Sequence, residues 1–186
     1  MFDKLLEWDR DAFIYLNGLG IEKYDGFWYV VTNGLSWIPI YLLFFVLIYL
    51  NYRKKEAFSV VATIGSAVLV VLALMQVTKT FVARLRPSSD PNLNTLIRIV
   101  TSPGGYSFFS GHAAASFCLT TLVVLFLRKK FKWIWVFYLW PLLFSLSRIY
   151  VGVHYPLDLI VGALVGTLCA FLFFTLHQKF RPPYSE

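Results

Sequence analysis

The sequence predicts an all-α membrane protein of one domain, residues 1–186, built as a bundle of five transmembrane helices. Of its 186 residues, 58% are hydrophobic, and the mean hydropathy is +0.65. Soluble domains contain only about 45–50% apolar residues. The apolar residues also fall into five runs of roughly the length that crosses a bilayer. Short basic loops separate several of these runs, as is typical of membrane proteins.

Residues 1–26 are predicted to form an interfacial amphipathic helix ahead of the bundle. Apolar and charged residues alternate through positions 3–20. This pattern is too polar to cross a bilayer but suits a helix lying in the interface. If the segment inserted, the bundle would have six spans. The N-terminus lacks a basic start followed by an apolar run, so we expect no cleavable signal peptide and a first span that serves as its own insertion signal.

The five spans follow from the apolar runs and the polar residues that bound them. A long polar connection separates the second and third spans, and its residues 88–108 have no predicted structure. The fifth span carries Gly162 and Gly166, a small-xxx-small spacing that lets helices approach closely. Cys118 and Cys169 fall inside apolar runs and are interpreted as core residues. The predicted spans are Phe27–Leu50, Ala57–Thr78, Phe109–Leu127, Trp133–Leu146 and Leu157–Leu176.

The basic loops predict the orientation of the bundle. Loops 51–56 and 128–132, together with the C-terminal tail, hold nine Lys and Arg residues and should be cytoplasmic. Five spans then bring three polar clusters, within residues 79–87, 110–112 and 147–158, to the outer face of a cell (inner) membrane. The same loops account for much of the net charge of +7, so nucleic acid is not an expected partner.

The stretch 147–158 joins two apolar runs, yet it contains Arg148, His154 and Asp158. Ionisable side chains cost about 2.5–3.5 kcal/mol each at the bilayer centre, so those near a span indicate function. If a helix begins near Pro156, His154 and Asp158 lie one turn apart, and the carboxylate can orient the imidazole. The alternative is a purely structural cap on the fifth span.

The polar residues predicted on the outer face suit phosphate chemistry. Several cations can neutralise phosphoryl oxygens, and a helix that begins at Ser110-Gly111 offers backbone N–H groups to an anion. Two histidines can divide nucleophilic attack from proton transfer. A single carboxylate argues against a metal centre. Lys79 and Arg148 could instead be snorkelling anchors. The candidate residues are Lys79, Arg84, Arg86, Ser110, His112, Arg148, His154 and Asp158.

Three blocks within residues 79–158 resemble the type 2 phosphatidic acid phosphatase (PAP2) superfamily of membrane-integral lipid phosphatases. They are Lys79-x6-Arg86-Pro87, Ser110-Gly111-His112, and Ser147-Arg148-x5-His154-x3-Asp158. One departure is Phe109, where the family often has proline before Ser-Gly-His.

The resemblance implies a role for each matching residue. His154 would be the nucleophile that forms a phosphohistidine, Asp158 would hold its tautomer, and His112 would protonate the leaving group. The phosphoryl group would be bound by Lys79, Arg86, Ser110, Gly111 and Arg148. Arg84 lies outside the family pattern, and we expect it to contact a second phosphate or a lipid headgroup.

The expected function is a metal-independent, cofactor-free lipid-phosphate phosphatase acting on a substrate in the bilayer. Undecaprenyl diphosphate is the first choice for two reasons. A chain without extra domains suits a housekeeping enzyme that recycles a lipid carrier, and Arg84 could bind a second phosphate. Phosphatidylglycerophosphate, phosphatidic acid and lipid A phosphates are alternative substrates. Other functions considered are a lipid phosphotransferase, a vanadate-dependent haloperoxidase, which the five spans argue against, and a non-catalytic lipid-binding or transport protein. The oligomeric state is not predicted.

Overall fold

The computed structural model describes residues 2–180, and all regular structure in that range is helical. The end of the basic tail, predicted to be cytoplasmic, lies outside these residues. The α-helices are α1 Phe2–Gly18, α2 Asp25–Thr32, α3 Ile38–Asn51, α4 Lys54–Val82, α5 Gly111–Leu127, α6 Leu139–Tyr150 and α7 Pro156–Phe180. Short 3₁₀ turns cover Glu22–Tyr24, Gly34–Trp37, Pro87–Ser89 and Lys132–Tyr138.

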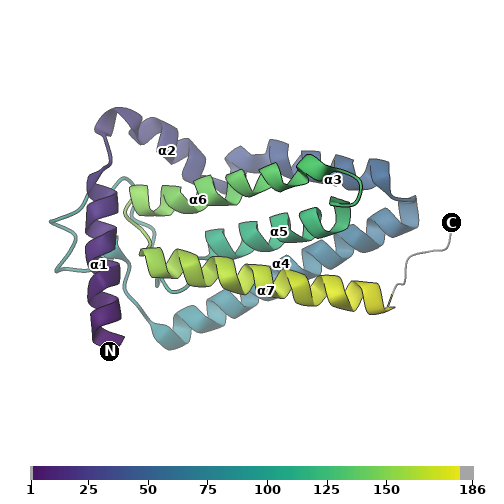
Figure 1. The fold of residues 1–186 in the computed structure, drawn as a ribbon. Helices are drawn as coiled ribbons and strands as arrows, with labels where there is room; N and C mark the ends of the chain where they lie inside the picture. Colours follow the sequence, from purple (N-terminus) through teal and green to yellow (C-terminus); the bar gives the residue numbers. More distant parts are fainter. Residues whose placement is uncertain (1, 181–186) are drawn as a thin grey trace.

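Helices α3 to α7 run side by side as a bundle, and α1 lies across one end of it (Figure 1). Helix α5 is central, because it packs against α4, α6 and α7. Three segments are long and apolar enough to cross a membrane: Gly34–Asn51, Lys54–Ser89 and Pro156–Phe180. Helix α5 is a shorter apolar helix, and α6 is continued at its start by a 3₁₀ turn. The predicted all-α membrane fold is confirmed.

The first predicted span is not one continuous helix. It is divided into α2, a 3₁₀ turn and α3, with the break at Asn33 and Gly34. The side chain of Asn33 accepts a hydrogen bond of 3.0 Å from the N–H of Leu35. Such local side-chain bonds compete with the helical backbone pattern and favour a new helix start. The separate helix α2 is therefore free to pack against α6.

Helices α5 and α7 approach each other closely at two glycines. A Cβ atom added at Gly162 would lie 2.6 Å from the carbonyl oxygen of Ser110, and one at Gly166 would lie 2.1 Å from that of Ala114. Only glycine fits at such distances, which confirms the close approach predicted from the small-xxx-small spacing. This packing brings the first turns of α5 and α7 together.

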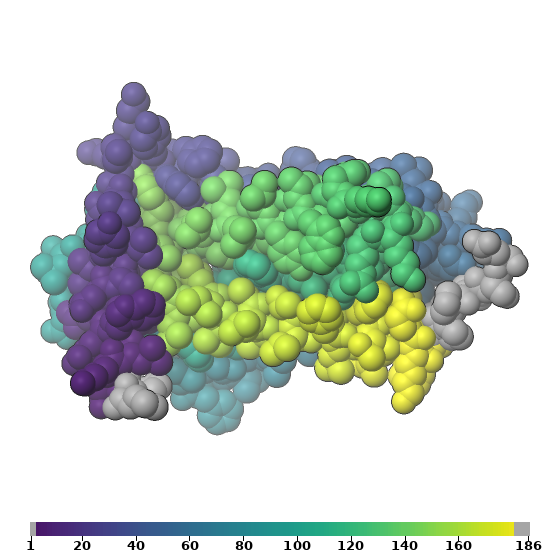
Figure 2. All heavy atoms as spheres, viewed as in Figure 1, coloured from purple at the N-terminus to yellow at the C-terminus, as the bar shows by residue number. Residues whose placement is uncertain are grey.

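Helix α1 packs against the bundle with an unexpected face. Its fully buried residues are Asp9, Phe13 and Asn17, each with 0% exposure. They recur every four residues and therefore share one side of the helix. Trp8, one of the apolar residues among positions 3–20, is 59% exposed. In the space-filling view α1 stands against the ends of α6 and α7 (Figure 2).

The glycine contact between α5 and α7 gives a matched test of the packing. Gly166→Ala should destabilise the protein by about 1–3 kcal/mol, because the added methyl group forces the two helices apart. The control is Gly65→Ala on α4, where an added Cβ meets nothing within 4 Å. Thermal unfolding in detergent should show a lower Tm for Gly166→Ala alone. Equal Tm values for the two variants would contradict the packing described here.

Candidate active site

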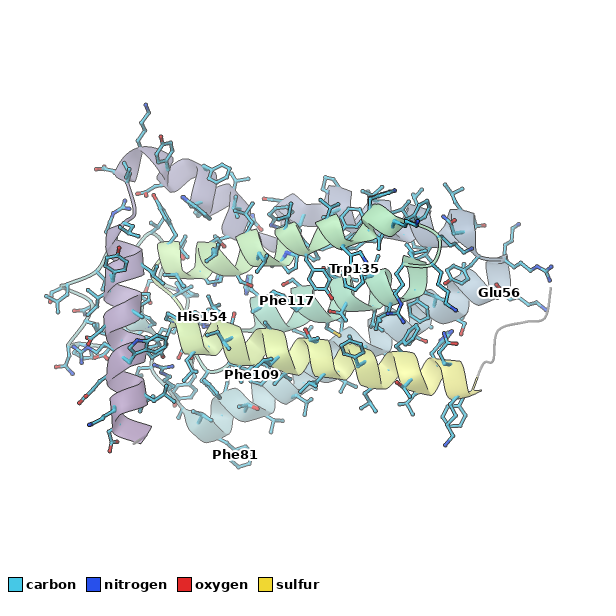
Figure 3. All side chains as sticks on the ribbon, viewed as in Figure 1. Glu56, Phe81, Phe109, Phe117, Trp135 and His154 are labelled. Carbon is cyan, nitrogen blue, oxygen red and sulfur yellow. The ribbon has the colours of Figure 1, made fainter. Side chains whose placement is uncertain are left out.

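The three polar clusters meet at the end of the bundle that α1 crosses. Lys79 lies in the last turn of α4, and Arg148 in the last turn of α6. His112 lies in the first turn of α5, and Asp158 in the first turn of α7. Figure 3 shows His154 at the same end, where α6 ends and α7 begins, beside α1. The convergence predicted from topology is therefore present.

His154 and Asp158 form a buried hydrogen-bonded pair. Nδ1 of His154 lies 3.2 Å from Oδ2 of Asp158, and their side chains are 1% and 0% exposed. Helix α7 begins at Pro156, as the spacing required. The same Oδ2 accepts the N–H of Tyr155 at 3.1 Å. A carboxylate beside Nδ1 keeps the proton there, which leaves the lone pair of Nε2 available.

Burial lowers the pKa of His154 well below its usual value. The nearby guanidinium groups of Arg148 and Arg86 lower it further. Both effects disfavour the charged imidazolium. The neutral ring is therefore the favoured form.

Arg86 is fixed beside Nε2, the unprotonated ring nitrogen of His154. Its Nε donates to the carbonyl oxygens of Gly104 and Gly105 at 3.3 and 3.2 Å, so residues of the long connection hold it. Its Nη1 donates to the carbonyl oxygen of Val153 and to Nε2 of His154, both at 3.2 Å. A phosphoryl group approaching Nε2 would meet this guanidinium at once.

Arg148 is held by α2, a helix in which no site residue was predicted. Its Nη1 donates to the hydroxyl of Thr32, at the end of α2, and its buried Nε has no hydrogen-bond partner among the described residues. Thr32 falls within the first predicted span and was missed. Asn33, whose side chain caps the following turn, is the sequence feature that could have predicted a helix end next to Thr32.

The start of α5 is tied directly to the start of α7. Ser110 is the N-cap of α5, where its hydroxyl accepts the N–H of Ala113 at 3.4 Å. Its own N–H donates to the carbonyl oxygen of Asp158 at 3.0 Å. Ser110 is fully buried, whereas Gly111 and His112 line the cavity described below. The imidazole of His112 packs against Phe144, with ring centroids 4.9 Å apart.

Arg84 is engaged in contacts that the sequence did not predict. Its Nη1 lies 2.9 Å from Oδ1 of Asp158, and its Nη2 lies 2.7 Å from Oδ2 of Asp9 on α1. Its guanidinium also lies over the ring of Tyr155, 3.7 Å from the centroid. Arg84 is not among the residues that line the cavity. These contacts tie Arg84 to the candidate catalytic pair, and the expected contact with a second phosphate or a lipid headgroup stays a prediction.

A role for Asp9 in the site was not predicted, because Asp9 is one of the charged residues that the sequence analysis assigns to an interfacial helix. The spacing of Asp9, Phe13 and Asn17 places them on one face, and that face is the buried one. Their four-residue spacing is the sequence feature that could have predicted this buried face.

A cavity of about 530 Å³ connects these groups to the interior of the bundle. On α4 its lining runs from Lys79 back to Val68, about 16 Å at a helical rise of about 1.5 Å per residue. One end is cationic, and the rest is lined mainly by aliphatic and aromatic side chains. Its lining comprises Tyr41, Val68, Leu72, Met75, Lys79, Arg86, Pro103, Gly111, His112, Ala115, Ser116, Leu119, Trp140, Phe144, Arg148 and His154.

The arrangement can bind an anion and transfer a phosphoryl group. Three cationic side chains and two histidines share the polar end of the cavity. Within residues 2–180, no group of three or more His, Cys, Asp or Glu residues could hold a metal ion. Fixed guanidinium and ammonium groups can stabilise the charge that develops on phosphoryl oxygens.

Known proteins are similar to this chain in both sequence and fold. The chain is 32% identical over 187 residues to a lipid A 4'-phosphatase of Bacteroides thetaiotaomicron, covering 96% of this chain and 81% of that protein. It is 36% identical over 172 residues to an undecaprenyl-diphosphatase of Sulfolobus acidocaldarius, covering 91% of this chain and 73% of that protein. Among solved structures, a transmembrane PAP2-type phosphatidylglycerolphosphate phosphatase of Bacillus subtilis aligns with a TM-score of 0.75 at 18% identity, covering 97% and 89% of the two chains.

The family model of the PAP2 superfamily matches residues 56–182. This range contains all three sequence blocks that suggested the resemblance, which is thereby confirmed. The chain therefore belongs to the PAP2 superfamily and is a membrane-integral hydrolase of phosphoric esters.

Proposed function

We propose that this protein removes the phosphate group from a membrane lipid through a phosphohistidine intermediate on His154. The observation that carries the proposal is the two-part cavity. Its cationic end suits a phosphate headgroup, and its apolar length along α4 suits the hydrocarbon part of the same molecule. Ligand sites typically combine an apolar lining with a few polar groups that fix orientation.

In the proposed first step, Nε2 of His154 attacks phosphorus. The bond between Nε2 and phosphorus forms while the bond between phosphorus and the lipid oxygen breaks. His112, held protonated by the negative charge of the bound phosphate group, gives its proton to that departing oxygen. Asp158, bonded to Nδ1, stabilises the positive charge that the ring acquires. Lys79, Arg86 and Arg148 balance the charge on the three phosphoryl oxygens.

In the second step, water attacks the phosphorus atom of the phosphohistidine. His112, now neutral, takes a proton from the water as the new oxygen–phosphorus bond forms. The bond from Nε2 to phosphorus breaks, and its electron pair returns to the ring. Inorganic phosphate leaves, and both histidines are again in their starting states.

The geometry favours a phosphomonoester substrate. The cationic end of the cavity presents Lys79, Arg86 and Arg148, which together suit a single phosphoryl group. Arg84, the residue expected to serve a second phosphate, is instead bonded to Asp9 and Asp158. A lipid A phosphate or phosphatidylglycerophosphate fits this arrangement. The similarity to the lipid A 4'-phosphatase, which covers 96% of this chain, supports the first of these.

Undecaprenyl diphosphate is the second candidate. The undecaprenyl-diphosphatase of Sulfolobus acidocaldarius is 36% identical to this chain, which favours it. For either substrate we propose that the site opens on the periplasmic or extracytoplasmic side of the cell membrane. The support is the charge of the opposite end of the bundle, where loops 51–56 and 128–132 carry seven Lys and Arg residues.

Replacing the nucleophile gives the direct test of this function. His154→Ala should lower kcat by roughly 10⁴-fold or more, the scale seen when other enzymes lose a nucleophile. His177→Ala is the matched control, because His177 lies in the last turn of α7 at the other end of the bundle, beside Thr63. Phosphate release from lipid in detergent micelles is the measurement. Equal activity of His154→Ala and His177→Ala would refute the mechanism.

A panel of lipids, run with and without a chelator, tests substrate and metal dependence together. The purified protein should release phosphate from lipid A phosphate or phosphatidylglycerophosphate with a higher kcat/KM than from undecaprenyl diphosphate. A chelator should leave each rate unchanged, because fixed cations supply the charge that a metal ion otherwise provides. A preference for the diphosphate would overturn the substrate assignment. Loss of activity with the chelator would overturn the proposed source of charge.

A further inference from the structure

The buried face of α1 contacts the loop that carries the proposed nucleophile. The ring of Phe13 packs edge-on against Tyr155, with centroids 5.4 Å apart. The amide of Asn17 donates to the carbonyl oxygens of Ile149 and Tyr150 at 3.0 and 3.1 Å, at the end of α6. Asp9 accepts the N–H of Leu157 at 2.8 Å, at the start of α7. Helix α1 therefore holds both ends of the turn around His154.

Asp9 is also the first member of a continuous chain of charged groups. Its Oδ2 lies 2.7 Å from Nη2 of Arg84, whose Nη1 lies 2.9 Å from Oδ1 of Asp158. The other oxygen of Asp158, Oδ2, lies 3.2 Å from Nδ1 of His154. Asp9 and Asp158 are fully buried, and Arg84 is 18% exposed. One guanidinium thus joins two buried carboxylates, and the second carboxylate reaches the nucleophile.

The two carboxylates share the charge of Arg84. Burial raises the pKa of Asp9, but the N–H of Leu157 and the guanidinium of Arg84 oppose this shift. With Asp9 in place, one terminal nitrogen of Arg84, Nη2, is paired with a carboxylate that lies away from the reacting groups. Without it, Asp158 alone would balance the full positive charge of Arg84. Its carboxylate would then be less able to stabilise a positive imidazole, and Arg84 would be free to turn.

We propose that Asp9 is a positioning residue for the reaction, acting through Arg84 on the Asp158–His154 pair. This inference rests on the proposed phosphohistidine function of His154. Asp9 touches neither the cavity nor the reacting groups, so its effect should fall on the chemical step and not on substrate binding. Helix α1 would then be a working part of the active site as well as a cover over the end of the bundle.

A simpler role for Asp9 is to dock α1 onto the bundle. Docking alone predicts that the loss of Asp9 lowers stability and the yield of folded protein, with normal turnover in the molecules that fold. Positioning predicts that folded molecules turn over more slowly. The two roles therefore differ in kcat per folded molecule and in their dependence on Asp158.

The test is a double-mutant cycle in the full chain with Asp9→Asn and Asp158→Asn. Asp9→Asn should lower kcat by about 10- to 100-fold, as when outer partners of functional histidines are lost, with KM changed by less than about threefold. In the Asp158→Asn background, the same substitution should change kcat by less than about twofold, because the route to His154 is already broken. Asp11→Asn, an exposed carboxylate on the same helix, is the control and should leave kcat unchanged.

Stability measurements and a milder variant complete the test. If Asp9→Asn fails to fold, Asp9→Glu keeps the charge but displaces the carboxylate, and it should lower kcat with KM unchanged. A lowered Tm with normal kcat in either folded variant would overturn the proposal, as would equal effects of Asp9→Asn with and without Asp158. Turnover by the unmodified protein tests the proposed function separately, so a failure of that function can be distinguished from a failure of the role proposed for Asp9.

Discussion

The structure depends on the buried carboxylate of Asp158. A charge with no exposure to solvent must be compensated by hydrogen bonds and opposite charge. Asp158 has both: the guanidinium of Arg84 on one oxygen, and the imidazole of His154 with the N–H of Tyr155 on the other. These partners come from the segment just after α4 and the loop before α7. Satisfying this one group therefore fixes several elements at the polar end of the bundle.

The backbone of the same residue connects α7 to α5. The carbonyl oxygen of Asp158 accepts the N–H of Ser110, and the glycine contacts between α5 and α7 allow the two helices to come that close. His112, two residues after Ser110, is thereby brought to the same cavity as His154. Helix packing in the apolar part of the bundle and hydrogen bonding at its polar end thus together place His112 and His154 at one cavity.

Sequence reasoning recovered the parts of the site that depend on local spacing and on topology. The four-residue separation of His154 and Asp158 predicted their contact once a helix began at Pro156, and the order of the spans predicted that the three blocks converge. It did not recover the partners of Arg84, because the contact with Asp9 joins residues far apart in the chain. The roles of Asn17 and Thr32 have the same origin. Each is a polar residue whose partner is supplied by tertiary packing, which periodicity along one helix does not reveal.

The central claim is that His154 attacks through Nε2 because Asp158 occupies Nδ1. The direct measurement is the position of a trapped phosphoryl group. His112→Asn, given a short phosphate ester with a nitrophenol leaving group that needs no proton, should accumulate the intermediate, since hydrolysis lacks its base. After an alkaline quench, mass spectrometry and phosphorus NMR should find phosphate on Nε2 of His154. Phosphate on Nδ1, on any other residue, or absent from the protein would contradict the account.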